Sequence, residues 1–392
     1  MGRCFGAPVA RGAANRGRRG RADARRPDHR TTHRGGAARP ACACRPGARR
    51  PARSGRQARG LRVRVGALPA ADRDTTPPCT RMDELVRQLQ DGRRTLGRLA
   101  SSAGAAVVAV PTPVLVDPGA SVTRQPRYER IREEFGELAR SSLACAMHVH
   151  VAIEADEDGA VLLDGVGPWL PVLLALSANS PYWDGHDTGY ASWRTQIWTR
   201  WPSNGTGEPF GTQQEYDDVA ERLVEWGAAL DEGMVYFDAR LSRTYPTLEF
   251  RVADVSTDLE DAIVFCALAR ALVSTVADPS AGRRMPRWRS DLLRAASRYG
   301  LAGQLVDPVR RELVPARQAL ESLVAHVKVA LDDAGDLPLV ENLIERLLAR
   351  GGGATRQRRA FETGGDLESV VADLRTRTEE SWTSRATWLD DT

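Results

Sequence analysis

Three short segments of the chain alternate apolar with titratable side chains, which is the pattern of β-strands and restricts how those strands can pack. The segments are 147–151, 235–240 and 245–252. Successive side chains of a strand point to opposite faces, so His148 and His150 share one face while the neighbouring valines share the other. Each strand therefore has an apolar face for helices to cover and a second face of titratable groups.

The titratable faces of the three strands carry residue types with related chemistry. Imidazole and carboxylate groups can bind divalent cations, and guanidinium groups bind phosphate or carboxylate through paired hydrogen bonds. The residues expected on this shared face are His148, His150, Arg240, Glu249 and Arg251. The pattern favours a groove for a metal ion and phosphates. A hydrogen-bonded histidine pair in the core, or a cross-strand ion pair, would explain any one strand taken alone.

The rest of the body separates into helical and extended runs. Apolar periodicity predicts helices over 82–99, 127–139, 161–179, 215–227 and 261–277, and strands over 105–110, 144–153, 234–240 and 247–253. Thr80, three residues before Asp83, predicts a variant capping box at the start of the first helix. The remainder to about residue 378 reads as helical, interrupted at 351–353. Runs of this kind argue for an α+β fold with an antiparallel sheet.

Residues 1–77 differ from the body in composition. Up to residue 80 the chain has 20 arginines, four aspartates and neither lysine nor glutamate, a net charge of +16 against +4 for the whole chain. With one aromatic residue, Phe5, this segment cannot bury enough apolar surface to offset its ordering entropy, so we expect disorder. A basic arm for nucleic acid, a targeting segment and GC-rich DNA read in a wrong frame or from a wrong start would each explain it. The last is favoured, because functional arms more often carry lysine and aromatics. Residues 78–380 then form the folded domain and 381–392 a tail.

Hydropathy gives no membrane span. The best apolar run, 166–178, falls short of the roughly 18 to 20 residues that a span needs and contains Pro168 and Pro171. Cys145 and Cys266 lie in apolar surroundings and are expected to be buried free thiols. We expect a cytoplasmic protein without membrane contact.

Five motifs together resemble the glutamate–cysteine ligase type 2 family over roughly residues 79–378. They are His-Val-His-Val at 148–151, Pro-Trp-Leu-Pro-Val-Leu-Leu-Ala-Leu-Ser-Ala-Asn-Ser-Pro at 168–181, Gly-His-Asp-Thr-Gly-Tyr-Ala-Ser-Trp-Arg at 185–194, Tyr-Pro-Thr-Leu-Glu-Phe-Arg-Val at 245–252 and Ala-Thr-Arg-Gln-Arg at 354–358. The resemblance implies a fold similar to the catalytic domain of glutamine synthetase, an antiparallel sheet backed by helices. It also implies a weak glutamate–cysteine ligase that uses ATP and Mg²⁺. The γ-carboxylate of L-glutamate would be activated as an acyl phosphate, and the amine of L-cysteine or another acceptor would displace the phosphate.

The resemblance also implies roles for individual residues. Those roles are catalysis for Glu249, Arg251 and Arg240; metal binding for His148, His150 and Glu249; nucleotide contacts for His150, Arg356 and Arg358; and substrate binding for Arg194, Asn179 and Ser180. Structural explanations stand beside these roles. Arg194 would serve equally in a surface ion pair, Asn179 and Ser180 in a helix-ending turn, and Arg356 and Arg358 in a solvated basic turn.

One family motif has no counterpart in this chain. Members open with a strand of consecutive glutamates, Gly-Val-Glu-Glu-Glu-Phe, which supplies metal-binding carboxylates. Glu133 and Glu134 lie in an expected helix and do not replace it. We therefore expect a sheet that lacks one strand and weak binding of the ATP–metal complex. A non-catalytic homologue that binds glutamate or nucleotide is the competing function, a homodimer is a candidate assembly, and nucleic acid is not an expected partner.

Overall fold

A central antiparallel sheet of four strands organises the folded part of the chain. The computed structural model describes residues 59–65, 75–116, 126–205, 209–278 and 292–389, all within the second of two units, 1–52 and 53–392. The strands are β1 (Leu61–Val65), β2 (Met147–Ala152), β5 (Ala239–Leu241) and β6 (Thr247–Phe250), and they pair in the order β1-β2-β6-β5. Together with the surrounding helices this confirms the predicted α+β class.

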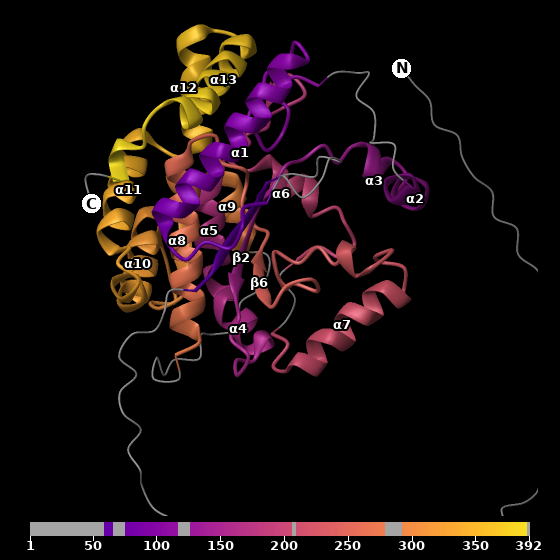
Figure 1. The fold of residues 1–392 in the computed structure, drawn as a ribbon. Coiled ribbons are helices and arrows are strands. Elements are labelled where there is room, and N and C mark those ends of the chain that lie inside the picture. The colour runs from indigo at the N-terminus through magenta and orange to yellow at the C-terminus, as the bar shows by residue number, and fades with distance from the viewer. Residues whose placement is uncertain (1–58, 66–74, 117–125, 206–208, 279–291, 390–392) are drawn as a thin grey trace, which may run out of the picture. The chain divides into compact units, whose positions relative to one another are not determined.

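One face of the sheet forms the floor of the hydrophobic core. Val149 and Val151 of β2 and Leu248 and Phe250 of β6 are fully buried. They pack beneath α8 (Leu259–Val276), with the rings of Phe250 and Phe265 meeting edge to face at 6.4 Å. Figure 1 shows α8 and α10 (Ala316–Asp333) on one side of β2 and β6, and α7 (Gln213–Glu225) on the other. Because α8 is apolar on nearly all sides, it lies inside the core rather than at its surface.

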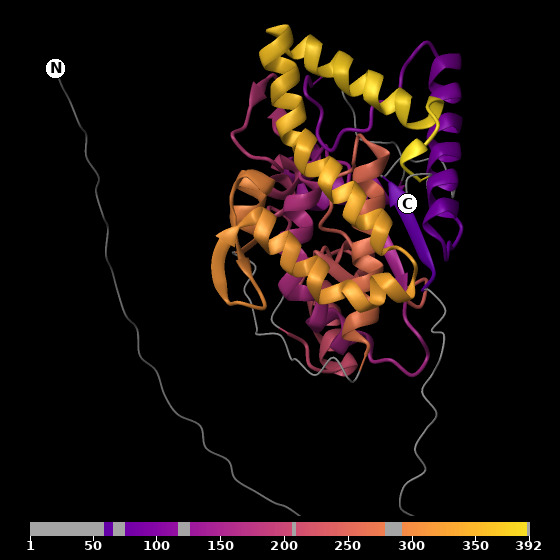
Figure 2. The same cartoon turned by 90° about the vertical axis from the view of Figure 1, so that its left-hand side faces the viewer.

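The C-terminal helices form a second layer outside α8, which faces the viewer in Figure 2. They are α11 (Leu337–Arg350), α12 (Gly353–Gly364) and α13 (Leu367–Thr383), and α13 packs beside α1 (Met82–Ser102). Gly351 has a φ of +83°, a conformation that glycine adopts without steric cost, and it ends α11 so that the chain can turn into α12.

The remaining elements are short. They are α2 (Pro126–Phe135), α3 (Glu137–Arg140), α4 (Gly159–Val166), α5 (Leu170–Ser177), α6 (Trp193–Trp198), α9 (Leu292–Tyr299), the hairpins β3 (Tyr182–Trp183) with β4 (His186–Asp187) and β7 (Gln304–Asp307) with β8 (Glu312–Pro315), and the 3₁₀ turns η2 (Gly167–Trp169), η3 (Glu232–Met234), η5 (Gly300–Ala302) and η6 (Thr387–Leu389).

The expected disorder of residues 1–77 is wrong for the part of that segment which the structure describes. Leu61–Val65 forms β1, and Leu61 exchanges two backbone hydrogen bonds with Cys79, at 2.6 and 2.7 Å. Arg59 is 8% exposed and donates to the carbonyl of Ala152 at 2.8 Å and to the hydroxyl of Ser274 at 3.1 Å. The described part of this segment therefore adds a strand to the sheet, although that strand is not the expected strand of consecutive glutamates. Residues 1–58 and 66–74 lie outside the described part of the chain.

Several predicted elements differ in extent from those observed. The predicted helix 161–179 is split into α4 and α5 by the 3₁₀ turn η2, which contains Pro168. The predicted helix 127–139 breaks at Gly136, whose φ is +53°. Arg81, not Thr80, is the N-cap of α1, and no side-chain hydrogen bond caps that helix.

Two secondary-structure predictions failed outright, one of a strand and one of a helix. Residues 105–110 are not a strand, because their backbone bonds to side chains: Ala109 accepts from the hydroxyl of Thr257 at 2.8 Å and donates to that of Thr378 at 3.1 Å. The hairpin of β7 and β8 lies in a region that was predicted to be helical.

Among the described residues, the helical stretch Gly159–Ser177 is long and apolar enough, by length and composition alone, to cross a membrane. In the fold 78% of its most apolar window is buried against the rest of the protein, as in the core helix of a globular domain.

Candidate functional site

Glu249 lies at the centre of the polar face of the central sheet. Its Oε2 accepts from Arg240 Nε at 2.7 Å, and its Oε1 accepts from a terminal nitrogen of Arg251, also at 2.7 Å. His148 Nδ1 lies 3.1 Å from the same Oε1, and His150 Nε2 lies 3.8 Å from it. The structure thus brings together all five side chains that strand alternation placed on one face.

The charges of this cluster depend strongly on burial. Burial by itself would raise the pKa of Glu249, but Arg251, the hydrogen bond from His148 and then Arg240 hold it well below its usual range. Burial and the nearby Arg251 lower the pKa of His148 to about 3, so its imidazole is neutral at physiological pH. Burial also lowers the pKa of Arg251 to about 10, which leaves its guanidinium cationic. The cluster is therefore one carboxylate held between two guanidinium groups and flanked by an uncharged imidazole.

The predicted metal ligands, His148, His150 and Glu249, lie close together but do not fit a divalent cation such as Mg²⁺. Magnesium needs oxygen ligands, and both oxygens of the one carboxylate already accept from guanidinium groups. In the part of the chain that the structure describes, no three histidine, cysteine, aspartate or glutamate side chains are arranged to hold a metal ion. The face is better suited to an anion than to a cation.

Asp238 and Arg251 extend the polar face beyond the ends of β5 and β6. The backbone N–H of Arg251 donates to the carbonyl of Asp238 at 2.8 Å, so the two residues are cross-strand neighbours. The guanidinium of Arg251 also lies over the ring of Tyr236, 5.7 Å from its centroid. Two buried atoms here have no hydrogen-bond partner: Asp238 Oδ2 and Arg251 Nε. Burial raises the pKa of Asp238 to about 6, against the opposing influence of Arg194 and Arg251.

Asp254, which sequence reasoning did not select, is the centre of a second buried cluster. One carboxylate oxygen accepts from Arg194 Nε at 2.7 Å and from the Ser192 hydroxyl at 2.9 Å. The other accepts from the Ser180 hydroxyl at 2.8 Å and from the backbone N–H of Asn179 at 2.9 Å. Asp254 is completely buried, and Arg194 is 2% exposed.

This cluster gives each of the predicted substrate-binding residues a structural partner. Arg194 does form an ion pair, but deep in the protein and not at the surface, and it also donates to the carbonyl of Val252 at 2.6 Å. Asn179 and Ser180 follow the end of α5 and hold the chain to Asp254. Their observed contacts are structural, and a role in substrate binding stays a prediction.

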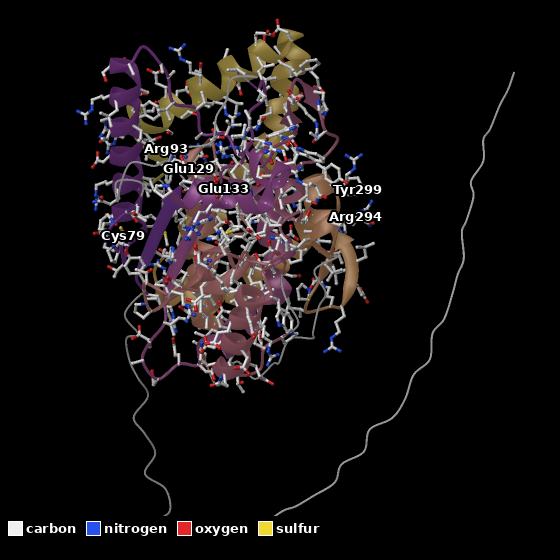
Figure 3. All side chains as sticks on the ribbon, turned by 90° about the vertical axis from the view of Figure 1, so that its right-hand side faces the viewer. Cys79, Arg93, Glu129, Glu133, Arg294 and Tyr299 are labelled. Atoms are coloured by element: carbon white, nitrogen blue, oxygen red, sulfur yellow. The ribbon has the colours of Figure 1, made fainter. Side chains whose placement is uncertain are left out.

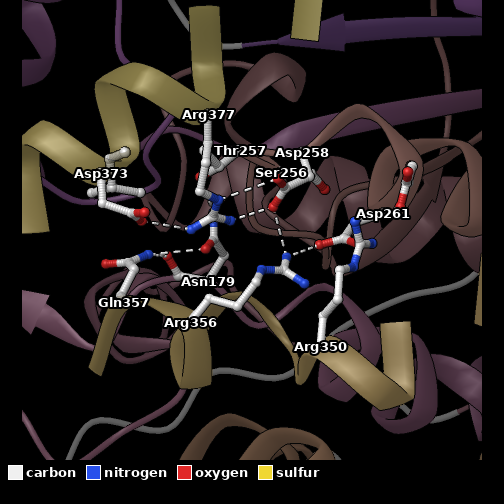
Figure 4. A network of polar contacts seen from close by, with 12 residues as sticks. Asn179, Ser256, Thr257, Asp258, Asp261, Arg350, Arg356, Gln357, Asp373 and Arg377 are labelled. Atoms are coloured by element: carbon white, nitrogen blue, oxygen red, sulfur yellow. Dashed lines mark hydrogen bonds and ion pairs between the residues drawn. The ribbon is translucent and has the colours of Figure 1, made fainter. Parts of the chain in front are cut away.

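Arg356 and Arg358, which were predicted to contact the nucleotide, lie in α12 and bind acidic side chains. Arg356 pairs with Asp258 at 2.9 Å and with Asp261. Figure 4 shows Arg356 in a network with Arg350, Arg377 and Asp373 that ties the C-terminal helices to the segment after β6. Arg358 pairs instead with Asp187, at 2.7 Å and partly exposed. Neither residue lies in a loose solvated turn.

Glu133 and Glu134 lie in a helix, as predicted, and so do not form a strand of glutamates. Both are exposed on α2, and Figure 3 shows Glu129 and Glu133 together on that helix. The free side of β2 pairs instead with β1, in a register that places Arg62 opposite His150 and Arg64 opposite His148. Its sequence, Leu-Arg-Val-Arg-Val, contains no acid.

Comparison of the sequence with known proteins gives a consistent result. A model of glutamate-cysteine ligase family 2 matches residues 74–373. A relative from Nocardioides sp., provisionally named glutamate–cysteine ligase 2-1, is 48% identical over 312 residues, which cover 78% of this chain and 81% of the relative. A relative from Frankia alni, provisionally named glutamate–cysteine ligase 2-2, is 48% identical over 300 residues, covering 75% of this chain and 78% of the relative.

Solved structures share the fold at low sequence identity. A glutamate–cysteine ligase from Francisella tularensis in complex with AMP has a TM-score of 0.56 and 11% identity, covering 86% of this chain and 92% of that one. A bifunctional glutathione synthetase from Pasteurella multocida has a TM-score of 0.58 and 14% identity, covering 83% of this chain and 53% of that one.

Proposed function

The chain belongs to glutamate-cysteine ligase family 2, and from this membership we propose that it joins the γ-carboxylate of L-glutamate to the amine of L-cysteine, or of another acceptor, at a low rate. Membership makes it an ATP-dependent carbon–nitrogen ligase. The likeness to a structure solved with AMP supports ATP as the nucleotide. Use of ATP favours a cytoplasmic location.

The proposed reaction has two steps. A γ-carboxylate oxygen of glutamate attacks the γ-phosphorus of ATP, and ADP leaves with the electrons of the broken bond. The amine then attacks the resulting acyl carbon, phosphate leaves, and the amine loses a proton as the amide forms. The first step brings two anionic groups together, and the second develops negative charge on the acyl oxygen and the departing phosphate, so the main requirement on the protein is to neutralise charge and to align the reactants.

The observation that carries the proposal is the cationic pair on the sheet. Arg240 and Arg251 flank Glu249 from both sides, and Glu249 fixes the two guanidinium groups in place through charge-assisted hydrogen bonds. Guanidinium groups held in this way suit the binding of phosphate and carboxylate oxygens. The sheet residues do not fit Mg²⁺, so no role for this ion is assigned to them.

The proposal is tested by trapping the activated intermediate. Purified protein is incubated with ATP, Mg²⁺, L-glutamate and hydroxylamine, and γ-glutamyl hydroxamate is measured by mass spectrometry, in parallel with γ-glutamylcysteine formed from L-cysteine. We expect both products, and we expect Arg251→Ala to abolish them. Arg317→Ala serves as the matched control, because it removes an exposed arginine that pairs with Glu321 on α10 and has no assigned role in the site.

One alternative is favoured by a specific observation. The neutralised Glu249 and the absence of acids from β1 suit a homologue that binds glutamate or nucleotide without catalysis. Calorimetric binding of ADP or L-glutamate, together with no hydroxamate from the same preparation, would establish this alternative.

A further inference from the structure

Asp238 is a buried carboxyl group whose surroundings leave it unsatisfied. Asp238 is only 6% exposed, and its Oδ2 has no hydrogen-bond partner. A buried carboxylate oxygen without a donor is costly, because it loses its hydration and gains nothing in return. Such an atom can be satisfied by protonation of the carboxyl group or by a hydrogen-bond donor that a ligand supplies.

The neighbours of Asp238 indicate the chemistry of that ligand. Arg251 lies directly across the strand pair and has an unpartnered buried Nε. Arg194 donates to the carbonyls of Arg251 and Val252, at 3.4 and 2.6 Å, so its guanidinium runs beside the same stretch of backbone. Both guanidinium groups lie close enough to act on the carboxyl electrostatically. Oδ2 of Asp238 thus lacks a hydrogen-bond donor, and Nε of the neighbouring Arg251 lacks an acceptor.

The two unfilled groups match the two charged ends of an α-amino acid. An ammonium group can donate three hydrogen bonds and accepts none. It would supply the donor that Oδ2 of Asp238 lacks. A carboxylate accepts hydrogen bonds from guanidinium groups. It would supply the acceptor that Nε of Arg251 lacks. A dicarboxylate without an amine would satisfy the arginine but would bring a second negative charge to Asp238.

We propose that Asp238 binds the ammonium group of the amino-acid substrate and so selects L-glutamate over dicarboxylates of the same length. This inference rests on the proposed function, since it takes glutamate as the substrate. It assigns Asp238 to substrate recognition, with Arg251 as the neighbouring donor to the carboxylate end.

The test compares L-glutamate with glutarate, which has the same two carboxylates and no amine. Binding of each is measured by calorimetry, with and without saturating ADP, for the wild type, for Asp238→Asn and for the control Asp91→Asn, which removes an exposed acid on α1 paired with Arg94. We expect the wild type to prefer L-glutamate, and Asp238→Asn to weaken L-glutamate binding roughly 10- to 100-fold, the range of one hydrogen bond to a charged group. Glutarate binding should stay within about twofold or tighten in that variant, since the ammonium contact is the only one removed.

Each outcome bears on the inference. Equal losses for both ligands, or no change in either, would overturn it. Failure of the wild type to bind L-glutamate would overturn both the inference and glutamate as the substrate. Discrimination that Asp238→Asn abolishes, in a protein that forms no hydroxamate, would uphold the inference and overturn only the catalytic proposal. Circular dichroism of Asp238→Asn, which we expect to match the wild type, excludes misfolding as the cause of lost binding.

Discussion

Replacing Asp238 with asparagine should stabilise the protein at neutral pH, and the size of the gain follows from the burial of this carboxyl group. Burial raises the pKa of Asp238 from 3.8 to about 6 in the folded state. The folded protein therefore holds a proton that the unfolded chain has released between these two values, and stability falls as pH rises through this window. Above pH 6 the full penalty applies, and at 1.36 kcal/mol for each pKa unit it amounts to about 3 kcal/mol.

Asparagine imitates the protonated group and removes the penalty. The difference in unfolding free energy between Asp238→Asn and the wild type should be near zero at pH 3, about 0.5 kcal/mol at pH 4, about half its full value at pH 5, and about 3 kcal/mol above pH 7. Urea unfolding followed by circular dichroism at these pH values measures it. Asp187→Asn is the control of opposite sign: the pKa of Asp187 is lowered by Arg358 and by the backbone of Gly189 despite its burial, so this variant should lose stability at neutral pH. An Asp238→Asn variant that is less stable than the wild type at every pH would show that the ionised carboxylate is satisfied by the arginines, and the reasoning would fail.

Three further changes test other parts of the structure by urea unfolding. Asp254→Asn removes the charge that pairs with the buried Arg194 and should cost about 3 to 5 kcal/mol; a loss below about 1 kcal/mol would contradict the structural role of this cluster. Arg358→Ala removes a partly exposed ion pair with Asp187 and a hydrogen bond to the carbonyl of Tyr190 at 3.0 Å. It should change the unfolding free energy by about 1 to 2 kcal/mol, so a larger loss would mean that Arg358 packs more tightly than these contacts indicate. Gly353→Ala would put a Cβ 2.7 Å from Cγ of the buried Asn179 and should cost about 1 to 3 kcal/mol, whereas a neutral result would show that α12 can move away.

Strand alternation was sufficient to predict the face of the sheet that carries the candidate site. A period of two determines which side chains share a face, whatever strands lie beside them. For this reason His148, His150 and Glu249 were placed together correctly, although they are about 100 residues apart in the chain. The same logic could not reveal β1, because an arginine-rich composition outweighed a five-residue alternation that only pairing with β2 stabilises.

The buried ion pairs were beyond the reach of sequence patterns. Asp254 lies four residues past the end of β6, where strand periodicity no longer applies, and its partner Arg194 lies 60 residues earlier. Arg356 looked like a solvent-exposed base because its acids, Asp258 and Asp261, lie in a segment about 95 residues away. The local sequence shows where a charged residue lies, but the residue with which it forms an ion pair depends on the packing of distant elements. Asp238 carried a usable signal, since it alternates with Arg240 on the predicted polar face.

The composition of β1 bears on the charge of the central sheet. A missing strand would leave β2 as an unpaired edge, yet β2 is paired along its length by a strand that contains no carboxylate. Within the four strands of the central sheet, Glu249 is then the only acid, and two guanidinium groups neutralise it. Guanidinium groups therefore outnumber carboxylates on the polar face of this sheet, and a surface of this kind attracts phosphate and carboxylate groups. In the proposed reaction the sheet contributes to catalysis by neutralising the anionic groups of the substrates, and Asp238 is the carboxyl group that we propose distinguishes among them.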